Sequence, residues 1–192
     1  MILPALLGDY SGMGRAGMVG DVITGQSTGL LIGLVFGLIF VEVNSGDVAS
    51  HWSFGLRVTG VMIAVILFVG LLRRRRSLDR AGKAAGRFDR RYWVVMVVEV
   101  VALLGGLVII NRVLDADRFT VAWVAVVVGV HFFGLGSIWR DRVLYLVGAV
   151  LTLLGLAGFL VGVAGGSAGA IALVSGVGSG VALFLVVGLA LL

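Results

Sequence analysis

The chain has 192 residues, of which 60% are hydrophobic and 13% are charged, and its formal net charge is +5. The charged share is about half of that in a soluble domain, and a soluble domain of this length could not bury so many apolar side chains. Composition therefore excludes an ordinary soluble enzyme and favours a protein that is solvated by lipid. The absence of cysteine excludes disulfides, thiolate metal sites and cysteine nucleophiles.

The first 23 residues are expected to form a cytoplasmic or interfacial N-terminal segment. Residues 1–7 are apolar but few, contain Pro4 and lack a basic start, so they do not resemble a cleaved signal peptide. Residues 8–20 are rich in glycine and mixed in character. A position along the membrane surface and disorder are both compatible with them.

Six apolar runs follow, each about as long as a membrane-spanning helix. They lack the alternating pattern of an outer-membrane barrel, so the sequence predicts an all-α polytopic membrane protein. The single membrane domain covers residues 24–192, and its expected spans are 24–43, 54–73, 92–111, 119–137, 143–163 and 169–192. Two halves of three spans each would have to be an inverted repeat, but no residue-level match between the halves supports one.

The loop 74–91 predicts the direction of the spans. With Arg73 it carries nine basic residues against Asp79 and Asp89, and loops of this kind stay in the cytoplasm. Both termini are therefore expected inside (N-in/C-in). The basic residues are expected to set topology and to bind anionic lipid headgroups at the cytoplasmic face; they are Arg73, Arg74, Arg75, Arg76, Arg80, Lys83, Arg87, Arg90 and Arg91.

The wider composition bears on location and partners. Arginine far outnumbers lysine, and Val, Gly, Ala and Leu dominate, which indicates a GC-rich bacterial genome. We therefore expect a multi-pass protein of the bacterial cytoplasmic membrane. Because most of the positive charge lies in one short loop between apolar runs, a nucleic-acid partner is not expected.

Glycines recur every four residues in the first and fifth spans. Residues four apart share one side of a helix, and small residues let a second backbone approach closely. Tight packing, within the chain or in a homo-oligomer, is the favoured interpretation, and a sliding surface in a transporter is the alternative. The residues assigned to packing are Gly25, Gly29, Gly33, Gly37, Gly158, Gly162 and Gly166. For the segment 162–169 a tight turn is favoured over a broken helix.

Glu99 is the one carboxylate in the run MVVEVVALLGG, about 10 Å from the cytoplasmic edge of its span at 1.5 Å per residue. His131, in GVHFFGLG of the next span, lies at a similar depth, about 9 Å by the same rise. Antiparallel helices joined by a short loop are usually neighbours. We therefore predict that His131 holds Glu99, directly or through a water, as a proton relay, a substrate contact or a static buried pair.

A second pair is predicted at the outer side, where Glu42 ends the first span and Arg57 begins the second. An interfacial salt bridge is the favoured interpretation. The alternative is an outer vestibule that also includes Asp47, His51 and Trp52.

No phosphate-binding loop, HExxH motif or catalytic constellation is present in the sequence, so no catalytic residue, metal or cofactor is assigned. The leading prediction is a small solute or ion transporter or channel-like protein, proton-linked through Glu99 and His131. It is expected to work as a homo-oligomer, because of the glycine rows and the thin core that six short helices provide. One alternative is a non-transporting accessory or structural subunit that binds lipid or a partner protein through its basic loop. A further alternative is a membrane-embedded enzyme that acts on lipid.

These predictions differ in the structure that they require. A transporter needs a polar cavity that reaches Glu99 and His131. A structural subunit needs instead a large apolar or glycine-lined contact surface. An enzyme needs a lipid-accessible opening beside at least two convergent polar side chains.

Overall fold

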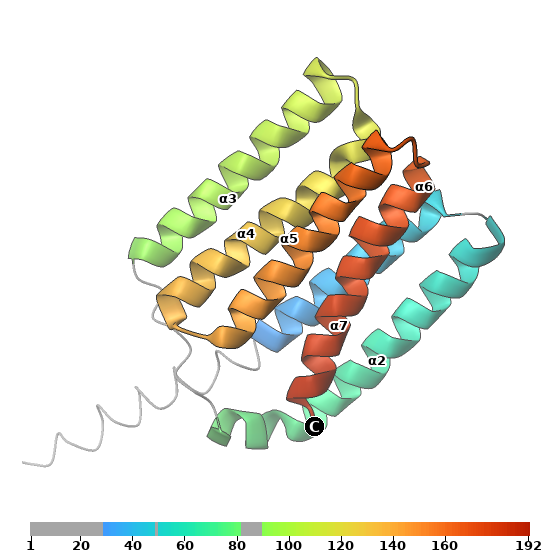
Figure 1. The fold of residues 1–192 in the computed structure, drawn as a ribbon. Helices are drawn as coiled ribbons and strands as arrows, with labels where there is room; N and C mark the ends of the chain where they lie inside the picture. Colours follow the sequence, from blue (N-terminus) through green and yellow to red (C-terminus); the bar gives the residue numbers. More distant parts are fainter. Residues whose placement is uncertain (1–28, 49, 82–89) are drawn as a thin grey trace, which may run out of the picture.

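The computed structural model describes residues 29–48, 50–81 and 90–192, and every regular element in these ranges is helical (Figure 1). By length and hydropathy, five of the helical segments could cross a membrane, which makes the chain a multi-pass membrane protein: Trp52–Arg74, Arg90–Val113, Asp117–Trp139, Arg142–Val163 and Ala168–Ala190. A shorter apolar helix, Gly29–Asn44, corresponds to the first expected span. The start of that span and the segment 1–23 lie outside the described residues.

The helices follow one another with short connections. After the Gly29–Asn44 helix come η1 (Ser45–Asp47), α2 (Ser50–Ala81), α3 (Arg90–Val108), η2 (Ile109–Val113), η3 (Asp117–Phe119), α4 (Thr120–Trp139), α5 (Arg142–Val163), α6 (Ala168–Ile171), η4 (Ala172–Val177) and α7 (Gly178–Ala190). Valine-rich sequences form helices here because a backbone in lipid must satisfy its own hydrogen bonds. The segments η2 and η4 are π-helical turns that continue α3 and α6.

The helix of the second span, α2, is longer than expected, although the span Trp52–Arg74 itself lies close to the expected 54–73. α2 continues to Ala81, so the first part of the expected loop 74–91 is helical, and residues 82–89 lie outside the described residues. Arg, Leu and Ala favour helix, and the extension contains no Gly or Pro that would end it.

The segment 162–169 forms a tight turn. α5 ends at Val163, Gly165 has a φ of +86°, and Ser167 caps the next helix by accepting a hydrogen bond from the Ala170 N–H at 3.2 Å. Glycine suits that left-handed backbone because it has no Cβ.

Figure 1 shows α3, α4, α5, α7 and α2 side by side in that spatial order, with the Gly29–Asn44 helix behind α5 and α7. α4 and α5 make the most extensive contact between any two helices in the described structure. One buried cluster joins the Gly29–Asn44 helix to α4, α5 and α7 through Phe40, Ala125, Val128, Val147, Leu151 and Leu183. A second joins it to α2 and α7 through Leu34, Val41, Ala64, Phe184 and Val187.

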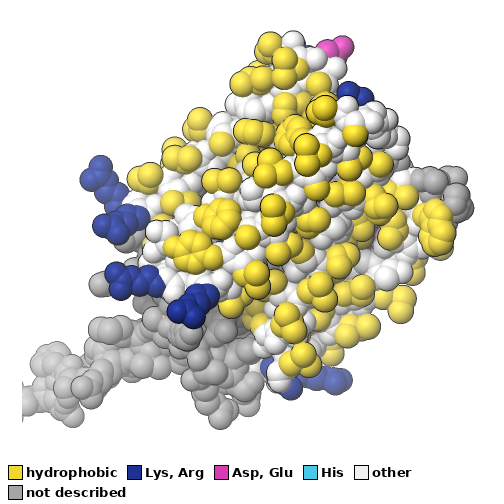
Figure 2. Space-filling model, viewed as in Figure 1, with side chains coloured by type: hydrophobic (Ala, Val, Ile, Leu, Met, Phe, Trp, Pro, Cys, Tyr) yellow, Lys and Arg dark blue, Asp and Glu magenta, His cyan; other side chains and the backbone are white. Residues whose placement is uncertain are grey.

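Charge divides the two ends of the bundle. One end, called the basic end below, carries the exposed residues Arg73, Arg74, Arg90, Arg91, Arg140 and Arg142. The opposite end carries Arg112, Asp115, Asp117 and Arg118. Between the ends the visible surface is largely hydrophobic, and dark-blue side chains mark its basic edge (Figure 2).

The glycines of α5 explain its close contact with α4. Gly148, Gly155, Gly158 and Gly162 are all buried, and Leu151 completes their spacing of three and four residues. A Cβ on Gly155 would lie 2.7 Å from the carbonyl oxygen of Ala122 and 2.7 Å from the Val126 nitrogen. The two backbones therefore touch, as small residues permit in membrane helices.

Candidate functional site

α3 meets α4 along a single stripe whose positions are spaced alternately by three and four residues, as in a coiled-coil seam. The stripe consists of Tyr92, Val95, Glu99, Ala102 and Gly106. This α3–α4 seam is formed by side chains, unlike the glycine contact between α4 and α5.

The partners on α4 follow the stripe along its length. The rings of Tyr92 and Trp139 stack at 6.1 Å with an interplanar angle of 16°. Trp123 lies over Gly106, and its indole N–H donates to the carbonyl oxygen of Ala102 at 3.2 Å. Aromatic surface therefore holds α3 at both ends of the seam.

Glu99 and His131 occupy the middle of the seam. Nδ1 of His131 lies 3.0 Å from Oε2 of Glu99, and the two side chains are 11% and 19% exposed, respectively. That nitrogen is enclosed and makes no hydrogen bond in the described structure, despite the short distance. The structure thus brings together the two residues that the sequence placed at one depth, as a short nitrogen–oxygen contact.

The pair lies deep in the hydrophobic segment. Glu99 is nine residues beyond Arg90 in the span Arg90–Val113, about 14 Å along the axis at 1.5 Å per residue. Ionisable groups at such depth ordinarily face protein and have partners. Within the described residues, Oε1 of Glu99 and Nε2 of His131 make no hydrogen bond, and neither atom is enclosed.

A polar contact closes the seam at the end opposite the basic end. Asn111 accepts a hydrogen bond from the Thr120 hydroxyl at 2.9 Å and donates to the Leu107 carbonyl at 2.8 Å. The bond joins the π-helical end of α3 to the first residue of α4.

Glu42 and Arg57 are not joined by an ion pair. In the described structure the two side chains form no ion pair; Oε1 of Glu42 is enclosed near Gly60 without a hydrogen-bond partner, and Arg57 is exposed beside Gly46. The side chains of Asp47 and His51 lie outside the described residues.

The glycines assigned to packing differ in their surroundings. Gly37 lies against Phe184 and the Gly180 carbonyl, Gly158 against Ser175, and Gly162 against Phe119. Gly33 is in loose contact with Val187, Gly29 faces open space, and Gly166 meets Val161 of its own turn. Gly25 lies outside the described residues.

The basic residues assigned to lipid binding are described in part. Arg73, Arg74, Arg90 and Arg91 are exposed at the basic end. The side chains of Arg75, Arg76 and Arg80, and the residues Lys83 and Arg87, lie outside the described part. Their binding of headgroups stays a prediction.

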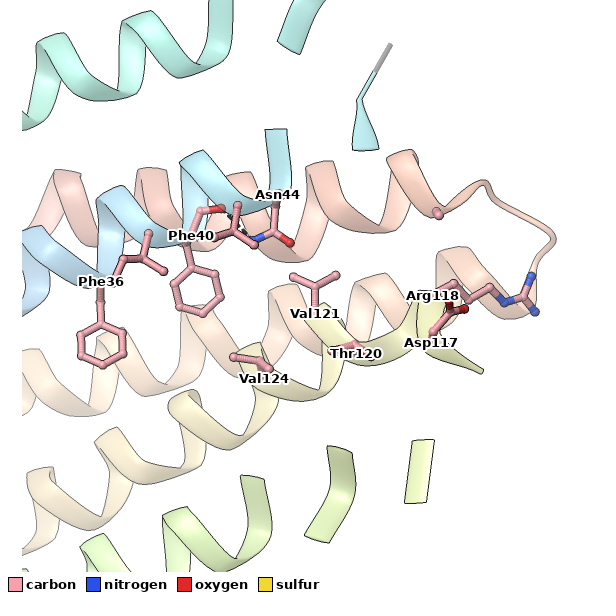
Figure 3. Close-up of a pocket in the computed structure, with 11 residues that line it drawn as sticks. Phe36, Phe40, Asn44, Asp117, Arg118, Thr120, Val121 and Val124 are labelled. Carbon is pink, nitrogen blue, oxygen red and sulfur yellow. Dashed lines mark hydrogen bonds between the residues drawn. The ribbon is translucent and has the colours of Figure 1, made fainter. Parts of the chain in front are cut away.

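A cavity of about 340 Å³ opens between the Gly29–Asn44 helix and α4, at the end opposite the basic end (Figure 3). Its walls are Phe36, Ile39, Phe40, Val43, Asn44, Asp117, Arg118, Thr120, Val121, Val124 and Ala168. We call it the groove. Neither Glu99 nor His131 lines it. The sequence alone does not reveal this site, because its residues come from three separate segments of the chain.

Within the described residues, no group of three or more His, Cys, Asp or Glu side chains could hold a metal ion. In comparisons with known proteins, no family model, curated protein or solved structure matches the chain.

Proposed function

We propose that the protein is a non-transporting, structural membrane subunit. It acts through the association of its helices with those of other subunits. In this proposal Glu99 and His131 lock α3 onto α4, and the opposite face of α3 packs against a second copy of the chain. The observation that carries the proposal is that α3 has no buried residue, although it crosses the whole bundle.

The side of α3 that faces away from α4 is called the free face below. Its exposed side chains have the same three- and four-residue spacing as those of the α3–α4 seam. Val94, Val97, Val101, Leu104 and Val108 are spaced alternately by three and four residues, and all are exposed. Val94 is two residues beyond Tyr92, which places this second stripe on the opposite side of the helix. Such a stripe can receive the side chains of another helix.

Gly105 supports a partner on this face. Gly37, Gly106, Gly129 and Gly155 each meet a neighbouring helix where their Cβ would be, whereas Gly105 has nothing within 4 Å. Membrane helices use small residues as points of close approach. Gly105 therefore provides a point on the free face at which the backbone of a second helix can come close.

Single-cysteine cross-linking in lipid vesicles tests this assembly, since the chain has no cysteine of its own. Two copies with the same topology are related by an axis along the membrane normal, so each residue of the interface faces its own counterpart at the same depth. Val101→Cys should form a disulfide-linked dimer on mild oxidation. Leu153→Cys on α5 is the matched control, because the two side chains are 65% and 64% exposed.

Dimer formation should fall several-fold when Gly105→Leu is added to Val101→Cys, because the larger side chain keeps the partner helix away. Equal cross-linking of Val101→Cys and Leu153→Cys, or none in either, would contradict the proposal.

Proton-linked transport is the second candidate. It is favoured by Oε1 of Glu99 and Nε2 of His131, which make no hydrogen bond in the described structure and are accessible to a proton donor or acceptor. The same vesicles test it under an imposed pH gradient. Transport predicts a flux that Glu99→Gln abolishes while the protein stays folded. The structural proposal predicts no flux in either protein.

For orientation, we propose that the basic end faces the cytoplasm of a bacterial cell, with both termini inside. Support comes from the six exposed arginines that gather there. An impermeant thiol reagent added to intact cells should label Val113→Cys and spare Arg140→Cys; the reverse result would invert the topology.

A further inference from the structure

We infer that the groove between the Gly29–Asn44 helix and α4 is a binding site for a phospholipid with a primary-amine headgroup. An acyl chain lies along its apolar walls, and the headgroup lies at its charged end. The site shares Thr120 with one end of the α3–α4 seam, but neither Glu99 nor His131 lines it, and it goes beyond the structural role proposed above.

The walls of the groove fit an acyl chain. Phe36 and Phe40 point from the Gly29–Asn44 helix towards Val121 and Val124 of α4 (Figure 3). The volume of about 340 Å³ falls within the range of ligand pockets, about 300–1,000 Å³. On the lipid-facing side, Ile39 is 50% exposed, so a chain can enter from the bilayer without passing through water.

The polar residues lie at one end, where the span meets the interface. Asp117 and Arg118 precede the first turn of α4, and Figure 3 shows them beyond the apolar side chains. They are neighbours in sequence but form no ion pair with each other in the described structure. The Arg118 guanidinium instead lies 4.8 Å from the centre of the Phe119 ring. One end of the groove therefore offers a separate cation and a separate anion.

Asn44 adds an acceptor inside the groove. The residue is 8% exposed, and its amide nitrogen donates to the Phe40 carbonyl at 2.8 Å. Within the described residues, its side-chain oxygen accepts no hydrogen bond, and Figure 3 shows it turned away from Phe40. That oxygen is not enclosed, so a ligand N–H can reach it.

These charges select the headgroup. Arg118 suits a phosphate, whereas Asp117 and Asn44 both accept hydrogen bonds. A primary ammonium carries three N–H donors for them. A choline headgroup has no N–H to donate, and a glycerol headgroup brings no positive charge to Asp117.

Native mass spectrometry of the full chain, released from vesicles of phosphatidylethanolamine, phosphatidylcholine and phosphatidylglycerol in equal parts, tests the inference. We expect one phosphatidylethanolamine to be retained, at about tenfold preference over each of the other two lipids. Arg118→Gln and Asp117→Asn should each reduce that retention about tenfold, the effect of losing one charge-assisted hydrogen bond.

The controls lie on the same turn of the chain. Arg112→Gln and Asp115→Asn remove the same charges at exposed positions that do not line the groove, and they should leave retention unchanged. Val43→Trp should narrow the groove and lower retention of the lipid, while Val113→Trp, a similarly exposed valine outside the groove, should not. Equal retention of the three lipids, a preference for phosphatidylglycerol, or equal effects of Arg118→Gln and Arg112→Gln would overturn the inference.

Discussion

α4 is held on its two sides by different means. Towards α5 the contact is between backbones, at Gly129, Gly148 and Gly155. Towards α3 it consists of side chains, chiefly the Trp123 indole and the Glu99–His131 pair. A backbone contact tolerates no added atom, whereas a side-chain contact can be weakened in steps. The first therefore builds the bundle, and the second decides how firmly one peripheral helix is attached.

The largest expected effect comes from filling the glycine contact. Gly155→Leu should lower the free energy of unfolding by about 3 kcal/mol, the upper part of the usual range for overpacking, because its Cβ would lie 2.7 Å from the Ala122 carbonyl oxygen. Denaturant titration in micelles measures the loss. Gly55→Leu, with open space around it, is the control; similar losses for both would mean that the close contact is not what stabilises the bundle.

A smaller loss of stability is expected when the Glu99–His131 contact is removed. Glu99→Gln should cost about 1–2 kcal/mol, since one partner of a mostly buried pair is left behind. A double-mutant cycle with His131→Gln should give a coupling of about 0.6–1.7 kcal/mol, the range seen between membrane helices. Hydrogen exchange should locate the loss in α3, with α5 and α7 unchanged.

Exchanging the two residues sharpens this test. If the pair is only structural, Glu99→His combined with His131→Glu should recover most of the stability that either change loses alone. Failure of the exchanged pair to recover stability, together with zero coupling in the cycle, would show that the 3.0 Å contact does not hold α3.

The smallest expected change in stability comes from removing either of two buried serine hydroxyls in the last span. Ser175 donates to the Leu154 carbonyl at 2.9 Å, whereas the enclosed hydroxyl of Ser179 has no partner in the described structure. Ser175→Ala should therefore cost about 0.6 kcal/mol, and Ser179→Ala should be neutral or slightly stabilising. Thermal unfolding of the two variants in parallel measures the difference, and the opposite order would contradict these hydrogen-bond assignments.

The membrane class and most span positions could be predicted from the sequence, because length and apolarity in a span are local properties. The Glu99–His131 contact could also be predicted from the sequence, since depth in the membrane and helix adjacency together limit where two polar residues can meet. The extension of α2 was missed, because a basic run was interpreted as a loop although its residues favour helix.

The groove could not be predicted in this way. Phe36, Asn44 and Arg118 come from helices that are not consecutive in the chain, so no spacing links them. The role of Gly129 in the α4–α5 contact was missed for a similar reason, because it belongs to no glycine row and acts through the backbone of another helix.

The order of synthesis gives the α3–α4 seam one more consequence. Ribosomes deliver the chain from its N-terminus, so α3 reaches the bilayer with Glu99 before α4 brings His131. A carboxylate is unfavourable in hydrocarbon, and until its counterpart arrives it is more stable at the water interface. Insertion of α4 removes that penalty. The pair therefore makes the final insertion of α3 depend on the synthesis of α4.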